Sequence, residues 1–141
     1  MTVMGLVRTK ISLSNPRRSD LDPVEVEALV DSGALHLCIP EHVAIQLQLD
    51  EFDQREVTIA DGSKHLISYK GPVAIACGKR KCLGGAMVLG SEVLLGAIPM
   101  EDMDLVIRPS KRDVIPNPLN PNIPASIAMG ERPAERSDRG N

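Results

Sequence analysis

The sequence has almost no aromatic residues: Phe52 and Tyr69 are the only two among 141 residues, and tryptophan is absent. The core must therefore consist of Val, Ile, Leu, Ala and Met, each of which buries less area than an aromatic side chain. A chain of this length has room for one domain. A small domain with such a core has modest stability alone, so the composition favours burial at a subunit interface.

Long apolar runs and a strong net charge are also missing. No window approaches the roughly 20 apolar residues of a membrane span, and residues 1–10 lack the pattern of a signal peptide. We therefore expect a cytoplasmic protein without a membrane partner. The formal net charge of −3 gives no reason to expect nucleic acid. The one tight basic cluster, Lys79-Arg80-Lys81, is expected to be a solvated turn.

Cysteine is scarce, with only Cys38, Cys77 and Cys82. An odd number of cysteines without a secretory signal favours reduced thiols. Cys77 and Cys82 are spaced like some metal ligands, but no second Cys or His pair has ligand spacing. We therefore expect no metal and no cofactor, and we expect these two thiols to face each other across a hairpin.

The chain reads as many short β runs separated by turn residues, which predicts an all-β fold. Strands are predicted at 3–13, 24–30, 35–39, 55–60, 65–69, 72–77, 82–89, 93–98 and 104–107, and helical turns at 40–47 and 99–103. Two hairpins are expected, one around Asp61-Gly62-Ser63 and one around 78–81. In the first, an Asp-Gly turn needs positive φ at both residues.

The last part of the chain differs in composition. Six of the eleven prolines lie from Pro109 onward, and residues 131–141 are charged and polar with nothing to bury. The sequence thus predicts a folded domain at 1–115 and a proline-rich, polar tail at 116–141 that is disordered or lies along a surface.

The predicted strand at 24–30 runs directly into the motif Asp31-Ser32-Gly33-Ala34. Alone this motif is weak evidence, because Asp, Ser and Gly are ordinary turn residues. Its surroundings are unusual, since the apolar residues at 29–30 and 35–39 place a carboxylate in a β environment expected to be buried. Burial of a carboxylate is costly unless it is paired or functional. Asp31 is therefore the main candidate for a catalytic residue.

The order of these features resembles the retroviral-type aspartic protease family, including its bacterial single-domain members. The Asp-Ser-Gly-Ala turn comes first, a hairpin at 55–69 stands where the family has its flap, and a hairpin follows around Cys77-Gly78. Leu94-Leu95-Gly96 then resembles the family's apolar pair plus glycine before a short helix. The resemblance implies a single-domain, closed β-barrel or sandwich with a flap hairpin and one or two short helices.

The same resemblance implies an aspartic endopeptidase, in which two aspartates activate a water for hydrolysis of a peptide bond. The chain has one such motif, so a second Asp31 would have to come from a homodimer. The implied catalytic residues are Asp31, Ser32 and Gly33. The implied substrate-binding residues are Ala34, Ala60, Asp61, Gly62 and Ser63, and the implied support of the active site is Leu95 and Gly96.

The chain departs from viral members of the family in two ways. The tip at 60–63 is more polar and less glycine-rich than viral flaps, so substrate choice cannot be transferred from them. The tail continues past the point where viral chains end in a dimer-interface strand, which leaves 3–7 and 104–107 as candidates for the dimer sheet.

Two other functions compete with the protease. The main alternative is a non-catalytic dimeric module on the same fold that binds an extended peptide by strand addition. A serine nucleophile at Ser32 is disfavoured, because the pattern Gly-x-Ser-x-Gly is missing.

Overall fold

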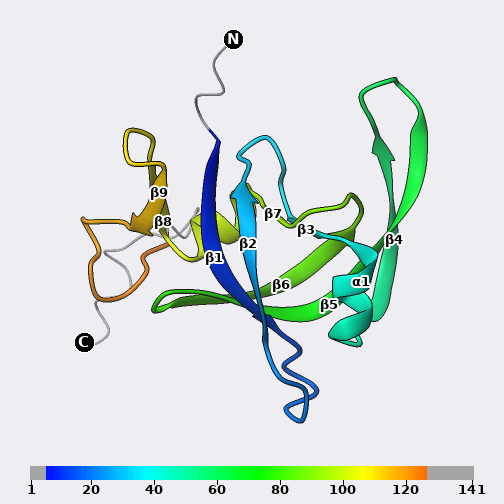
Figure 1. The fold of residues 1–141 in the computed structure, drawn as a ribbon, viewed down its shortest axis with the longest axis horizontal. Helices are drawn as coiled ribbons and strands as arrows, with labels where there is room; N and C mark the ends of the chain where they lie inside the picture. The colour runs from blue at the N-terminus through cyan, green and yellow to red at the C-terminus, as the bar shows by residue number, and fades with distance from the viewer. Residues whose placement is uncertain (1–5, 127–141) are drawn as a thin grey trace, which may run out of the picture.

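The computed structural model of the chain describes residues 6–126, and these residues form mostly β structure (Figure 1). The elements in chain order are β1 (Val7–Ser14), β2 (Val24–Val30), β3 (Leu37–Ile39), α1 (Glu41–Gln46), β4 (Asp50–Thr58), β5 (Lys64–Cys77), β6 (Arg80–Val88), β7 (Leu94–Leu95), α2 (Ala97–Asp102), β8 (Leu105–Arg108) and β9 (Asp113–Pro116). The predicted all-β class with two short helices is confirmed.

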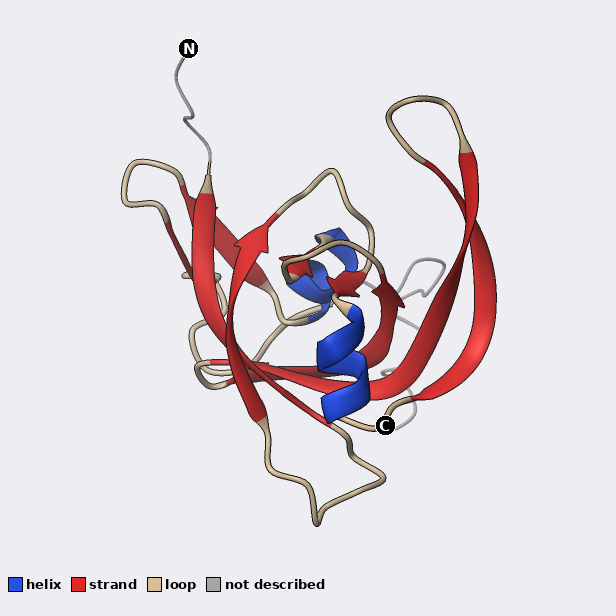
Figure 2. Cartoon of the chain, turned by 45° about the vertical axis from the view of Figure 1, so that its right-hand side comes forward, coloured by secondary structure: helices blue, strands red, loops and turns tan. Residues whose placement is uncertain are grey.

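Seven strands form one mixed sheet in the order β1-β2-β7-β3-β6-β5-β4. β1 also pairs with β5, from Ser12 opposite Ala76 to Ser14 opposite Ala74, so the sheet curls partly into a ring. Within residues 6–126, β4 pairs only with β5 at the end of this order, and the β4–β5 hairpin projects away from the ring (Figure 2).

The core fills the inside of this curled sheet. In β1 the side chains of Val7, Ile11 and Leu13 are buried while Arg8 and Lys10 are exposed, the period-two pattern of a strand with one buried face. The largest fully buried side chains are Ile11, Leu13, Leu37, Ile39, Leu47, Ile75, Leu95, Met103 and Val73. The core is thus aliphatic, as the composition requires.

The short strand β7 lies between β2 and β3. It runs parallel to β2, with Leu29 opposite Leu94 and Val30 opposite Leu95, and antiparallel to β3, with Cys38 opposite Leu94. β2 and β3 are consecutive in the chain, so the loop that joins them must pass over the end of β7. The topology therefore brings Gly96 to the loop that contains Asp31.

Both helices are short and each follows a strand end. α1 begins after Pro40, which is its N-cap and not its first helical residue. α2 begins at Ala97, two residues before the predicted start, because β7 ends at Leu95 and Gly96 is the N-cap. The predicted strand at 93–98 is consequently only two residues long.

The first hairpin forms where predicted, but its tip differs. β4 and β5 pair from Asp50 opposite Gly71 to Thr58 opposite Lys64. At the tip only Gly62 has positive φ, +88°. The expected two-residue Asp-Gly turn is therefore wrong. A longer loop forms because the Asp61 carboxylate accepts hydrogen bonds from the Ser63 N–H, at 2.8 Å, and from its hydroxyl, at 2.6 Å.

The second hairpin is tighter than expected. Cys77 lies opposite Arg80, so only Gly78 and Lys79 form the turn. Arg80 is 3% exposed, and the expectation of a fully solvated basic turn is wrong for this residue. Cys82 lies opposite Ile75, so Cys77 and Cys82 are diagonal neighbours and not directly opposite each other. All three cysteines are free thiols.

An additional strand follows the predicted last one. β9 pairs with β8, from Leu105 opposite Pro116 to Arg108 opposite Asp113. Part of the predicted tail is held against Asp104, whose carboxylate accepts hydrogen bonds from Asn117, Asn120 and the Ala125 N–H. Residues 127–141 of that tail, and residues 3–5 of one candidate dimer segment, lie outside the described residues.

Candidate active site

Asp31 directly follows β2, and its backbone is fixed by the neighbouring strand. Its N–H donates to the Leu95 carbonyl at 3.0 Å, which extends the β2–β7 pairing by one residue. Its carbonyl accepts the Ala34 N–H at 3.0 Å, which closes the turn. The position of the Asp31 Cα is therefore set by the sheet.

The carboxylate of Asp31 is oriented by the turn that it begins. The Gly33 N–H donates to Oδ1 at 2.9 Å. Val30 before it and Leu37 after it are buried, whereas Asp31 is half-buried and Ser32 and Gly33 are exposed. Val30 and Leu37 thus belong to the core, but Leu35 is 63% exposed and Asp31 is half-buried, so the expectation of a buried carboxylate is wrong for the single chain.

The loop that begins at Asp31 packs closely against Gly96. A Cβ at this position would lie 2.4 Å from the His36 carbonyl oxygen and 2.7 Å from that of Ala34, so only glycine fits. The loop is also bonded to the start of α2, because Ala97 N–H donates to Ala34 at 2.8 Å and Ile98 N–H to Leu35 at 2.9 Å. Leu95, fully buried, anchors this contact in the core.

The electrostatic neighbourhood of Asp31 includes the thiol of Cys38. Burial raises the pKa of the Cys38 thiol, and the negative charge of Asp31 raises it further. The Cys38 thiol donates to the His36 carbonyl at 3.9 Å. Because a neutral thiol is a poor nucleophile, Cys38 acts as an apolar residue beneath the loop.

The proposed flap tip lies on a different element. Ala60, Asp61, Gly62 and Ser63 are all exposed at the end of the β4–β5 hairpin. Both ribbon views place this tip and the loop after β2 at the same end of the molecule (Figures 1 and 2). The hydrogen bonds from Ser63 lower the pKa of Asp61.

The structure therefore brings together part of the predicted site. Asp31, Gly33, Ala34, Leu95 and Gly96 form one bonded unit. Ser32 is exposed beside Asp31. The four tip residues form a separate unit on the hairpin.

One group of residues near the site was not predicted. Tyr69 on β5 contacts His36, with ring centroids 5.4 Å apart, and Phe52, at 6.3 Å. The Arg55 guanidinium carbon lies 4.3 Å from the centre of the Tyr69 ring. Sequence offered one signal for this group, which is that both aromatic residues of the chain belong to it.

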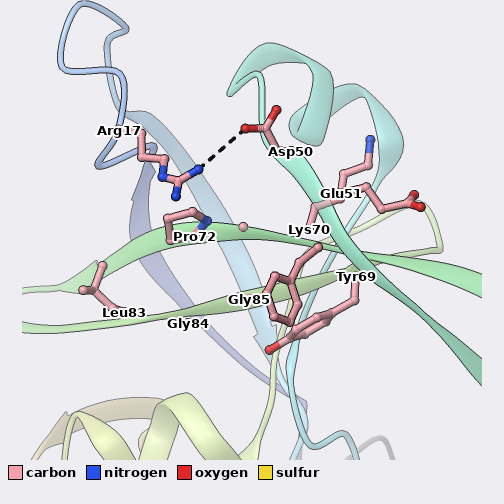
Figure 3. Close-up of a pocket in the computed structure, with 11 residues that line it drawn as sticks. Arg17, Asp50, Glu51, Tyr69, Lys70, Pro72, Leu83, Gly84 and Gly85 are labelled. Atoms are coloured by element: carbon pink, nitrogen blue, oxygen red, sulfur yellow. Dashed lines mark ion pairs between the residues drawn. The ribbon is translucent and has the colours of Figure 1, made fainter.

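Two pockets adjoin Tyr69. The larger, of about 470 Å³, lies at the base of the hairpin next to the Arg17–Asp50 ion pair, 3.9 Å long (Figure 3). The smaller, of about 270 Å³, extends toward His36 and α2. Tyr69, Leu83, Gly84 and Gly85 line both, so the ring and this part of β6 separate them. Asp31 lines neither pocket.

Among residues 6–126, no group of three or more His, Cys, Asp or Glu side chains is arranged to hold a metal ion. Within the same range, no helix has both the length and the apolar character needed to cross a membrane.

Comparison with known proteins gives no assignment. No protein-family model matches the chain, and a search of curated proteins finds no significant match.

Proposed function

We propose that the chain is one half of an aspartic endopeptidase, with an active site completed by Asp31 of the partner subunit. The observation on which the proposal depends is the support of the Asp31 turn. The turn is bonded to Leu95 and to α2, and it packs so closely on Gly96 that no side chain fits there. A carboxylate fixed so firmly yet left half-exposed is suited to chemistry, because catalysis requires a preorganised group.

The order of elements supports the same proposal. The motif resembles that of retroviral-type aspartic proteases, and the hairpin stands where that family has its flap. The partly closed, mixed sheet is compatible with the family's barrel. The hairpin and the Asp31 loop lie at the same end of the molecule, which suits closure over a substrate (Figure 1).

The proposed chemistry needs two chains. Two carboxylates about 3 Å apart cannot both ionise, so they share one proton, as is known for aspartic proteases in general. The ionised carboxylate accepts a proton from water, which attacks the scissile carbonyl. The protonated carboxylate donates a hydrogen bond to the carbonyl oxygen. Ser32 of each subunit would hydrogen-bond across the two-fold axis and brace the turns.

The test compares the parent with Asp31→Asn, which keeps the shape of the side chain. Both proteins are incubated with casein and with a peptide library from about pH 4 to 7, the range in which a shared-proton dyad should work. Cleavage should fall by about 100-fold or more, since acid and base catalysis contributes about 10²–10⁴-fold.

A control keeps the result interpretable. Analytical ultracentrifugation must show that Asp31→Asn has the same subunit composition as the parent. A monomeric parent, or equal cleavage by parent and variant, contradicts the proposal.

The second candidate is a dimeric peptide-binding module without catalysis. It is favoured by the position of β4 at the end of the seven-stranded sheet, where a strand edge is available for pairing. An extended peptide would add to this edge. Peptide binding without cleavage, unchanged by Asp31→Asn, would support this candidate over the protease.

A further inference from the structure

Tyr69 lies at the junction between the projecting hairpin and the curled sheet. On one side it is opposite Asp53 of β4, within the hairpin, and on the other side opposite Met87 of β6. The strand register shifts close to Tyr69 in both pairings. In the β4–β5 pair the shift lies between Glu51 and Asp53, and in the β5–β6 pair it lies between Lys70 and Val73. Beyond Tyr69 toward the tip, β5 pairs with β4 but no longer with β6, so the hairpin projects from this residue.

The Tyr69 ring has a defined place on β6. A Cβ added to Gly85 would lie 2.3 Å from the ring carbon Cζ and 2.5 Å from the hydroxyl oxygen, so the ring lies directly against the Gly85 backbone. Figure 3 shows the ring over β6 next to Gly85. At the adjacent Gly84, a Cβ would have no atom within 4 Å.

The same ring contacts two other elements. The Arg55 guanidinium carbon, from β4, lies 4.3 Å from the ring centre, a cation–π distance. His36, from the loop that begins at Asp31, meets the ring in an edge-on arrangement with an interplanar angle of 62°. Tyr69 thus touches the hairpin on one side and the Asp31 loop on the other.

The contact at His36 leads directly to the Asp31 turn. His36 closes the loop that starts at Asp31, and the carbonyls of His36 and Ala34 are the atoms that press against Gly96. A displacement of His36 would change the same packing that fixes the Asp31 turn. The coupling would therefore act through a short chain of direct contacts between half-buried side chains and the buried Gly96.

We propose that Tyr69 is a positioning residue that couples the position of the β4–β5 hairpin to that of the Asp31 loop. When the hairpin moves over a bound peptide, the ring moves on its Gly85 surface and transmits the motion to His36. The coupling is a property of the fold, whereas its effect on catalysis rests on the proposed protease function.

The decisive experiment displaces the ring without removing any of its atoms. Gly85→Ala places a methyl group where the ring now lies, and Gly84→Ala, in the same strand with free space, is the matched control. Amide hydrogen exchange is then measured for residues 55–66 and 32–36. Gly85→Ala should speed exchange at least about fivefold in both segments, and Gly84→Ala in neither.

A second set of variants shows whether the coupling passes through His36. Tyr69→Leu should speed amide exchange in both segments. Tyr69→Phe, which keeps the ring, should exchange at the same rates as the parent. In a His36→Ala background, Tyr69→Leu should alter the hairpin but no longer alter residues 32–36. If Gly85→Ala does not fold, these variants still decide whether Tyr69 couples the hairpin to the Asp31 loop.

Kinetics connect the coupling to the proposed activity. Tyr69→Leu should raise KM and lower kcat together, because it loosens both the hairpin and the turn, with kcat/KM about 10- to 100-fold lower. Tyr69→Phe should stay within about twofold of the parent.

Three outcomes are separable. Faster exchange in the hairpin with an unchanged loop overturns the coupling, and so does an equal response to Gly84→Ala and Gly85→Ala. A parent that cleaves no peptide defeats the protease proposal, while the exchange data still decide the coupling.

Discussion

Asp31 and Asp104 are two carboxylates at strand ends whose surroundings differ sharply. Asp31 accepts the Gly33 N–H and is half-exposed. Asp104 accepts hydrogen bonds from the Asn117 and Asn120 amides, at 3.1 and 2.8 Å, and from the Ala125 N–H at 2.9 Å. It also lies 4.0 Å from Nη1 of the buried Arg80.

The difference separates a carboxylate that holds the structure from one to which we assign chemistry under the proposed function. Arg80 donates to the carbonyls of Met103, Asp104 and Asn120, so together with Asp104 it fixes the segment that follows β9. The Asp31 side chain fixes little beyond its own turn, and its loop is held instead by backbone bonds and by Gly96. A carboxylate on a firmly held turn, with few hydrogen bonds of its own, is the arrangement that the proposed function needs.

The largest effect on stability should come from Gly96→Ala, which removes the support of the Asp31 loop. The added methyl would meet backbone carbonyls at 2.4 and 2.7 Å, and backbone cannot rotate away as a side chain can. We expect a loss of about 1–3 kcal/mol in the free energy of unfolding, measured by urea denaturation. Gly84→Ala, with no atom near the new methyl, is the control. Equal denaturation of the two variants would contradict the tight contact seen at Gly96.

The comparison is tested directly by making the same substitution at both carboxylates. Asp104→Asn removes one oxygen acceptor and the charge next to Arg80, while asparagine still tolerates the φ of +53° at this position. It should lower the urea midpoint and speed proteolysis between residues 117 and 126 by about tenfold. Asp31→Asn should leave both unchanged. If Asp31→Asn is the more destabilising of the two, Asp31 is a structural residue.

The smallest expected effect is the detachment of the segment 117–125 at low pH. The Ala125 N–H bond, followed by the Asn117 amide, lowers the pKa of Asp104. A lowered carboxylate pKa contributes stability above the unfolded value, about 3.9, and this contribution is lost as the pH falls through the folded value. The segment 117–125 should therefore detach below about pH 4, before the sheet unfolds, as seen by hydrogen exchange from pH 7 to pH 2. Attachment that persists down to pH 2 would show that the Asp104 charge is unimportant.

Several features could be predicted from local sequence because they depend on local physics. β2 has the predicted bounds at 24–30, since its alternating Val residues have the period of a strand. The Asp31 turn and the first hairpin also lie where Asp, Ser and Gly indicated. The hairpin tip was predicted less well, because the Asp61 side chain competes for the backbone hydrogen bonds that define the turn type.

Other features depend on residues that are distant in sequence. Arg80 lies in the most basic stretch of the chain, yet it is buried because carbonyls from 103, 104 and 120 meet its guanidinium. The sequence of β9 has no strong strand signal. The strand forms because its backbone pairs with β8. The cluster of Tyr69, His36 and Arg55 joins three separate elements, so no local pattern could reveal it.

The sequence alone determined that the core would be aliphatic, that the fold would be mostly β, and that a single Asp-Ser-Gly turn would end an apolar strand. Only the tertiary structure decided that β7 lies between β2 and β3, where Gly96 meets the Asp31 loop and the loop meets Tyr69 of the hairpin. The reason is physical: strand and turn preferences act over a few residues, whereas strand order follows from how the whole chain buries its apolar surface.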